Sequence, residues 1–283
     1  MPKTMKAKLL LGWMPEDEAI NFLNRCISDP PLSDEQKLQV WREHRARVEA
    51  LQRPYVRPEL QKLTILEKSN VTTFLNRLKG TPVRGKIRKA IKLNPSNLLI
   101  HQFYVITERS IQYANRINHK KERINHCLGT GLDERHKIVE TQQGTKTILK
   151  MPHFEFETKA RPGGFDINER GRFISVVEAN DRLLLWAGYH RTYAVLSQMA
   201  PDADGEAPLL ILMNGVEEVD RFLGVDSLRP FVRDAILCDR PPVFADFFDP
   251  NLAMEVNLIQ QRMEIHIEPK GTLIQATQVW VDV

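Results

Sequence analysis

The segment from Leu183 to Leu196 constrains this chain more than any other part of the sequence. Four apolar residues, Leu183–Trp186, form a candidate buried strand, and Ala187 then leads into Gly188. The residues that follow have helical spacing, so the segment predicts a strand that passes through one glycine directly into a helix. The first turn of such a helix has unpaired N–H groups, and glycine lets an anion approach them closely. The segment therefore predicts a phosphate site formed by Gly188, Tyr189, His190 and Arg191.

Two side chains in this turn could take part in chemistry. Arg191 offers a planar fork of donors that matches phosphate oxygens. His190 can bind phosphate or move a proton near neutral pH, so His190 and Arg191 are the candidate catalytic residues. Glu178 and Asp181 precede the turn and are candidates to hold Mg²⁺ by their nearness in sequence. The alternative is that Arg191 forms a structural ion pair with one of these acids.

Gly188, His190, Arg191 and Ala194 resemble the Gly-x-His-Arg-x-x-Ala phosphate-binding signature of the ParB/sulfiredoxin-like superfamily. That superfamily includes chromosome-partition CTPases, a free-serine kinase and ATP-dependent sulfiredoxins. The resemblance covers about residues 150–215. It implies a mixed sheet with helices, a nucleoside triphosphate with Mg²⁺ as cofactor, and hydrolysis or phosphoryl transfer. Tyr189 stands where sulfiredoxins carry a catalytic cysteine, which argues against that activity.

Charge is distributed unevenly along the chain. The net charge is +4, but residues 1–125 contain 24 Lys and Arg against 12 Asp and Glu, whereas the rest of the chain is acidic. Five of the nine residues from Arg84 to Lys92 are basic. Nucleic-acid phosphates attract such a cluster, although a solvated helix face is the alternative. The residues predicted to bind nucleic acid are Arg84, Lys86, Arg88 and Lys89, within a wider cluster that also includes Arg77, Lys79 and Lys92.

The spacing of apolar residues changes along the chain. Residues 1–125 follow mainly helical spacing, and Ser33 and Gln36 form a candidate capping box. Residues 126–146 are polar and contain glycine, which predicts a loop or linker. Residues 147–283 alternate with period two in several places, which predicts strands. We therefore expect an α+β protein, with a basic, mainly helical region at 1–125 and a ParB/sulfiredoxin-like α/β domain at 147–283.

Several features limit the class of protein. No apolar run approaches the roughly 18 residues that cross a bilayer, and no signal-peptide core follows the basic start. We therefore expect a cytoplasmic protein without a membrane partner. Cys26, Cys127 and Cys238 are far apart in sequence and are expected to be free thiols. Poor spacing argues against zinc at the ligand-type residues His119, His126, Cys127 and His136, so no metal site is expected.

Taken with the resemblance, these residues predict a protein that binds nucleotide or nucleic-acid phosphates. The expected partners are a nucleotide and nucleic acid. The alternative is a non-enzymatic DNA-binding or protein-interaction module in which the turn at Gly188–Arg191 is structural. The sequence does not decide whether the chain is an enzyme. Nucleotide-dependent heat stability distinguishes the readings, because a ligand that binds only the folded state raises it.

Overall fold

Helices and sheets of mostly antiparallel strands make this chain an α+β protein, as the sequence predicts. The structure is a computed structural model. It describes residues 3–80, 82–115, 117, 119–130, 139–151, 156–161, 164–169, 173–179, 181–198, 207–214, 236–270 and 273–282.

The described helices alternate with strands along the first half of the chain. The α-helices are α1 (Glu16–Leu23), α2 (Asp34–Glu49), α3 (Ile65–Arg77), α4 (Pro82–Lys86), α5 (Thr107–Ala114), α6 (Lys120–Leu128) and α7 (Tyr189–Gln198). Short 3-10 turns are η1 (Leu11–Trp13), η2 (Pro95–Asn97) and η3 (Phe244–Phe248). The strands are β1 (Thr4–Leu9), β2 (Cys26–Ile27), β3 (Ile87–Lys92), β4 (Tyr104–Ile106), β5 (Val139–Gln143), β6 (Lys146–Met151), β7 (Phe156–Arg161), β8 (Gly164–Glu169), β9 (Ser175–Ala179), β10 (Arg182–Ala187), β11 (Leu209–Met213), β12 (Met254–Ile259), β13 (Gln261–Lys270) and β14 (Leu273–Asp282).

These elements form two compact units that are interleaved in the sequence. Unit 1 comprises Met1–Met5, Leu132–Arg172 and Ile259–Val283, and unit 2 comprises Lys6–Gly131 and Phe173–Leu258. The contacts therefore do not follow the predicted sequential division into 1–125, 126–146 and 147–283. Residues 126–128 end α6 and residues 139–143 form β5, so part of the predicted linker is regular structure. Residues 131–138, including His136, lie outside the described part.

Sheet A in unit 2 joins segments from both ends of the chain. Its strand order is β2-β12-β1-β4, and β1 pairs antiparallel with β4. Three of these four strands precede residue 125. Most of the described strands, β6–β14, nevertheless lie from Lys146 onward, as expected. Sheet A combines the early strands β1, β2 and β4 with β12 from far along the chain.

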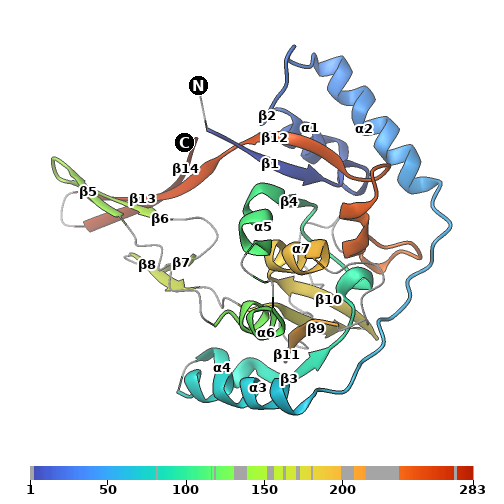
Figure 1. The fold of residues 1–283 in the computed structure, drawn as a ribbon. Helices are drawn as coiled ribbons and strands as arrows, with labels where there is room; N and C mark the ends of the chain where they lie inside the picture. Colours follow the sequence, from blue (N-terminus) through green and yellow to red (C-terminus); the bar gives the residue numbers. More distant parts are fainter. Residues whose placement is uncertain are drawn as a thin grey trace. The chain divides into compact units, whose positions relative to one another are not determined.

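Sheet B, also in unit 2, positions the turn at Gly188. Its strand order is β10-β9-β11-β3, with β9 and β10 antiparallel and β11 parallel to β9. An antiparallel hairpin of β9 and β10 precedes Gly188, and the predicted strand-to-helix transition from β10 to α7 is confirmed. Asp181 turns this hairpin with a φ of 60°. Figure 1 shows α5 and α7 side by side between sheet A and sheet B.

Local sequence signals fix the starts of two helices. The predicted capping box at Ser33 is present, since its hydroxyl accepts from the Gln36 N–H at 3.2 Å and its own N–H donates to Gln36 Oε1 at 2.8 Å. Thr64 and Glu67 form a second capping box at the start of α3. Reciprocal bonds of this kind satisfy N–H groups that the first turn leaves unpaired.

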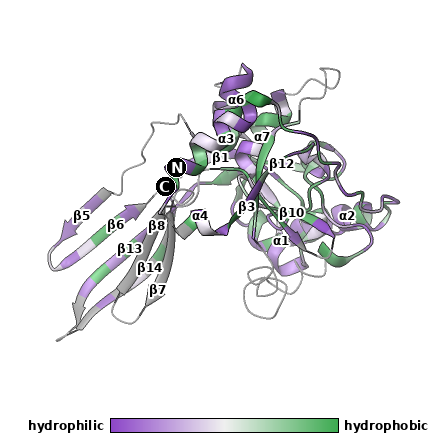
Figure 2. Cartoon of the chain, turned by 90° about the horizontal axis from the view of Figure 1, so that it is seen from below, coloured by the Kyte–Doolittle hydropathy of each residue, from purple (hydrophilic) through white to green (hydrophobic). Residues whose placement is uncertain are grey.

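Unit 1 contains a four-stranded sheet with the order β14-β13-β6-β5, and the separate hairpin β7–β8. Strand β13 pairs with β14 along its full length, from Gln261 opposite Asp282 to Lys270 opposite Leu273. Met263, Ile265 and Ile267 alternate with polar residues, and Figure 2 shows hydrophobic and hydrophilic residues following one another along β13. The predicted period-two alternation thus corresponds to strand structure here.

Candidate nucleic-acid interface

Gly188 occupies a backbone conformation that only glycine adopts easily. Its φ is +95°, and a Cβ added at this position would lie 3.0 Å from the Ile174 Cα on the neighbouring segment. The glycine therefore allows a close approach of two backbones as well as a left-handed turn. The predicted strand-glycine-helix geometry is present, but the atoms nearest to Gly188 belong to the protein's own core.

Tyr189 is built into this core. Its side chain is 4% exposed, and its hydroxyl accepts from the N–H groups of His101 at 2.8 Å and Gln102 at 3.2 Å. The same hydroxyl donates to the Leu185 carbonyl at 3.1 Å. Burial raises the pKa of Tyr189 well above its ordinary value. Tyr189 therefore connects α7 to the segment before β4, and its hydroxyl is already used by three main-chain groups.

Arg191, the residue predicted to face an anion, is buried between helices. It is 8% exposed, and its Nη1 donates to the His126 carbonyl on α6 at 2.8 Å. His126 Nε2 donates back to the Arg191 carbonyl at 3.4 Å. The guanidinium also lies 5.3 Å from the ring centroid of Tyr113 on α5. Arg191 thus joins α5, α6 and α7, whereas His190 beside it is half-buried at the first turn of α7.

The two carboxylates predicted to hold Mg²⁺ are bound to arginine. Arg57 Nη2 lies 2.5 Å from Glu178 Oε1, and Arg57 Nη1 lies 2.7 Å from Asp181 Oδ1. Arg88 adds a contact of 3.0 Å to the other oxygen of Glu178. Hydrogen bonding and charge from Arg57, with Arg88 beside it, hold the pKa of Glu178 below its usual range. Glu178 and Asp181 thus pair with Arg57 and Arg88 rather than with Arg191, so the alternative of an ion pair between Arg191 and one of these acids is not observed in the described residues.

The residues predicted to bind nucleotide and Mg²⁺ at the turn contact other residues of the protein. The arginine fork is engaged by His126, and the candidate metal-holding acids are engaged by Arg57. Within the described residues, no group of three or more His, Cys, Asp or Glu side chains is arranged to hold a metal ion. His126 and Cys127 are both buried in α6. The described contacts of Arg191, Glu178 and Asp181 are therefore contacts within the protein.

The predicted nucleic-acid residues instead lie on consecutive elements at one border of unit 2. Arg84 and Lys86 belong to α4, and Arg88 and Lys89 belong to β3. All are exposed except Arg84, which is half-buried. Figure 1 shows α3 and α4 together beside β3. We call the basic surface the set formed by Arg77, Lys79, Arg84, Lys86, Arg88 and Lys89.

A β-bulge explains why two neighbouring residues of β3 both face solvent. Ile87 is paired with Met213 and Lys89 with Leu212, so β3 has one residue more than β11 at this point. The extra residue is Arg88. A regular strand directs successive side chains to opposite faces, but a bulge relaxes that alternation. Arg88 and Lys89 are therefore exposed together, while Ile87 stays in the core.

The charge of this region is almost all of one sign. Residues 61–92 contain nine Lys and Arg but one acid, Glu67. Glu67 is 3% exposed and lies 3.0 Å from the ammonium of Lys92, which is 5% exposed. This buried pair removes Lys92 from the predicted cluster, and it leaves no acid of this segment on the surface. Glu178 pairs with Arg88, but the surface is predominantly positive, and a surface of this kind attracts a polyanion.

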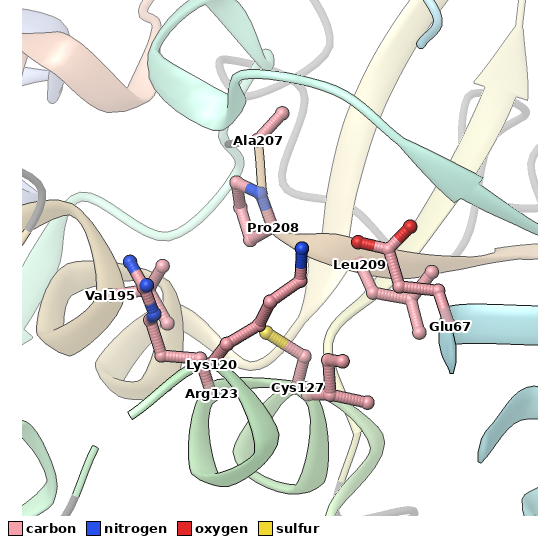
Figure 3. Close-up of a pocket in the computed structure, with 9 residues that line it drawn as sticks. Glu67, Lys120, Arg123, Cys127, Val195, Ala207, Pro208 and Leu209 are labelled. Carbon is pink, nitrogen blue, oxygen red and sulfur yellow. The ribbon is translucent and has the colours of Figure 1, made fainter. Parts of the chain in front are cut away.

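A second pair of cations lies nearby on α6. Lys120 and Arg123 line a small cavity of about 20 Å³ together with Glu67 of α3 and Cys127 below them (Figure 3). A volume of this size holds about one water molecule, whereas nucleotide-sized ligands occupy pockets of roughly 300–1,000 Å³. Burial raises the pKa of the Cys127 thiol to about 12, so the thiol is not a nucleophile at neutral pH. The cavity is therefore too small for a nucleotide-sized ligand.

Sequence reasoning missed part of the positive region. Lys62 and Lys68 are exposed at the start of α3, and Lys120 and Arg123 lie on α6, which packs against α3. Lys62 and Lys68 could have been found from the sequence, because the excess of basic residues extends over residues 61–92 and not only over the nine residues from Arg84 to Lys92. Lys120 and Arg123 could not have been assigned to this region from the sequence, because only the folded structure brings α6 close to α3.

No family model, curated protein or solved structure shows a significant match to this chain. Among the helices that the structure describes, none is long and apolar enough to cross a bilayer. The function is therefore argued from the geometry and charge of the described residues.

Proposed function

We propose that this chain binds nucleic acid through phosphate contacts made by the basic surface. The observation that carries the proposal is the run of nine basic residues and one acid in residues 61–92, together with the buried pairing of that acid. Positively charged side chains on α3, α4 and β3 match the regular negative charge of a nucleic-acid backbone. Contacts to phosphate do not read bases, so the binding is expected to be largely independent of sequence.

The rigid setting of the basic surface supports the proposal. β3 pairs with β11 along its length, and Gln61 donates to the Lys92 carbonyl at 2.8 Å on the other side of β3. The cations of α4 and β3 are thus attached to a fixed sheet. A fixed array loses less conformational freedom on binding than the same charges on a disordered tail.

Salt dependence tests the proposal. We expect the affinity of purified protein for a fluorescein-labelled 20-base-pair duplex to fall steeply between about 50 and 200 mM salt, since binding releases counterions. The slope of log K against log salt changes by roughly 0.9 for each phosphate contact. Fluorescence anisotropy with duplex and single-stranded forms of the same sequence measures both affinities.

A charge-matched pair of variants localises the contacts. The triple variant Arg84→Gln, Lys86→Gln, Lys89→Gln should lose about tenfold or more in affinity, and its salt slope should be smaller by about 3. Arg88 is kept because it pairs with Glu178. The control variant removes the same charge at exposed residues outside α3, α4, β3 and α6, by Lys3→Gln, Lys6→Gln and Arg42→Gln. Equal losses in both variants, or no binding by the wild type at low salt, would contradict the proposal.

Nucleotide binding at the turn is a second candidate, in keeping with the resemblance to the ParB/sulfiredoxin-like superfamily. The observation that favours it is the direct passage from β10 through Gly188, at a φ of +95°, into the N-terminus of α7. A thermal-shift screen of nucleoside triphosphates with and without Mg²⁺ tests it, because a bound ligand raises the melting temperature. A shift that His190→Ala abolishes would support this candidate, and the absence of any shift would leave the basic surface as the binding site.

A further inference from the structure

Sheet A has an incomplete edge. β2 pairs with β12 at two positions only, Ile27 opposite Asn257 and Cys26 opposite Leu258. β12 begins three residues earlier than this pairing, at Met254, whereas the chain after Ile27 leaves the sheet and leads into α2. In the described part of the chain, no strand pairs with Met254–Val256 on this side. About three residues of strand, or roughly 10 Å of backbone, therefore border open space.

A cavity of about 360 Å³ lies along this edge. Four consecutive residues of β12, Met254–Asn257, line it, and so do three consecutive residues of the opposite segment, Cys26–Ser28. Successive side chains of a strand point to opposite faces of the sheet. A cavity that contacts four residues in a row must therefore lie beside the edge of the strand, in the plane of the sheet. This is the space where an adjoining strand would run.

Seven of the twelve residues that line the cavity are apolar. They include Leu23 at the end of α1, Leu32 before α2, and Met254 and Val256 of β12. Ile27 at the rim is 41% exposed, which is high for a large apolar side chain. The volume lies at the lower end of the range of small-ligand pockets, roughly 300–1,000 Å³. The site thus combines a strand edge that no described strand covers with space for one or two apolar side chains.

We infer that this edge binds an extended peptide segment of a partner protein. About three residues of the segment pair with the backbone of Met254–Val256, which extends sheet A beyond β2. One apolar, β-branched side chain of the segment occupies the cavity between Leu23 and Leu32. The open strand edge selects an extended peptide over a small apolar molecule, because only a peptide supplies backbone groups at strand spacing.

Two peptides that differ in one methyl group test the inference. The probe is acetyl-Thr-Val-Thr-N-methylamide, and its control carries an N-methyl group on the valine nitrogen. We expect the probe to cause saturable shifts of the Met254–Asn257 amide resonances in two-dimensional NMR of the full chain. The control keeps the side chains but loses a backbone donor, so it should bind about tenfold more weakly or not at all. Equal binding of both peptides would assign the cavity to small apolar ligands and overturn the inference.

A cavity-filling variant provides an independent test. Leu32→Trp places a larger side chain in the wall and should abolish the shifts caused by the probe. Ile111→Trp adds the same side chain at a position on α5 that is 53% exposed, and it should bind the probe as the wild type does. The absence of saturable shifts in the wild type at millimolar probe, or unchanged binding by a folded Leu32→Trp variant, would overturn the inference.

Discussion

At Arg191, one guanidinium connects three helices that the sequence separates widely. Tyr113, His126 and Arg191 come from α5, α6 and α7, and the two main-chain contacts between His126 and Arg191 run in both directions. A motif that resembles a phosphate signature is used here to hold helices together. The sequence shows that an arginine follows the glycine. It does not show that the acceptor of this arginine is a main-chain carbonyl 65 residues away.

Arg191→Ala should therefore destabilise the fold. Removing the guanidinium leaves the buried His126 carbonyl without this donor and removes the contact with the Tyr113 ring. We expect a loss of about 2–3 kcal/mol in the free energy of unfolding, measured by urea titration. The control Arg42→Ala, at an exposed position of α2, should change stability by less than about 0.5 kcal/mol. If Arg191→Ala is as stable as the wild type, the structural role is contradicted and Arg191 is again a candidate to contact a ligand.

Gly188 and Gly80 separate the effect of backbone conformation from the effect of close packing. Both have positive φ, +95° and +85°, but only Gly188 has a backbone atom within 3.0 Å of an added Cβ. Gly80→Ala should cost about 1 kcal/mol for the left-handed conformation. Gly188→Ala should cost about 2–4 kcal/mol, since it adds a clash with Ile174. Thermal or urea unfolding of both variants checks the difference, and equal costs would show that the Ile174 segment moves freely.

Secondary-structure elements show where sequence reasoning succeeds in this chain. The capping box at Ser33 and the passage from β10 to α7 are local patterns, and the structure confirms both. The start of α3 is not evident from the sequence, because its first two residues, Ile65 and Leu66, are 88% and 46% exposed and obscure the apolar stripe of the helix. The basic residues of β3 did not indicate a strand, since the bulge at Arg88 breaks the alternation. The order of strands in sheet A depends on contacts between distant segments.

The junction of α3 and β3 depends on the buried pair Glu67–Lys92. Lys92→Met should cost about 3–5 kcal/mol, because it leaves the Glu67 carboxylate buried without its cation. Adding Glu67→Met should recover most of this loss. A residual cost of about 1 kcal/mol should remain, since Glu67 also accepts from the Thr64 N–H at 2.7 Å in the capping box. Urea titration of the two single variants and the double variant measures the coupling, and additive costs would contradict a direct interaction.

For the whole molecule, two histidines with lowered pKa values, half-buried His101 and buried His126, predict how stability responds to acid. Burial lowers the pKa of His101 to about 4, and burial together with the charge of Arg191 lowers the pKa of His126 to about 3. An unfolded histidine titrates near pH 6.5, so protons favour the unfolded chain below that value. The stabilising contribution is complete above about pH 6.5 and is lost as the pH falls toward 4 and 3. Each histidine contributes a slope of up to about 1.4 kcal/mol per pH unit.

Urea titrations between about pH 7.5 and 4.5 check this dependence. His126→Gln should be less stable at neutral pH but should show a shallower loss of stability as the pH falls, because it no longer takes up a proton on unfolding. His119→Gln, at an exposed position, is the matched control and should keep the slope of the wild type. Identical slopes in all three proteins would show that His126 is not held neutral by the fold.

The strand order of sheet A also determines when this protein can finish folding in a cell. β12 begins about 245 residues after the end of β1 yet lies between β1 and β2. At about 5–20 residues per second, a ribosome needs roughly 12–50 s to make that stretch. During this interval β1 and β2 lack the strand that joins them. The nascent chain therefore exposes an unpaired strand edge throughout most of its synthesis. Chaperones at the ribosome exit site would bind such an edge.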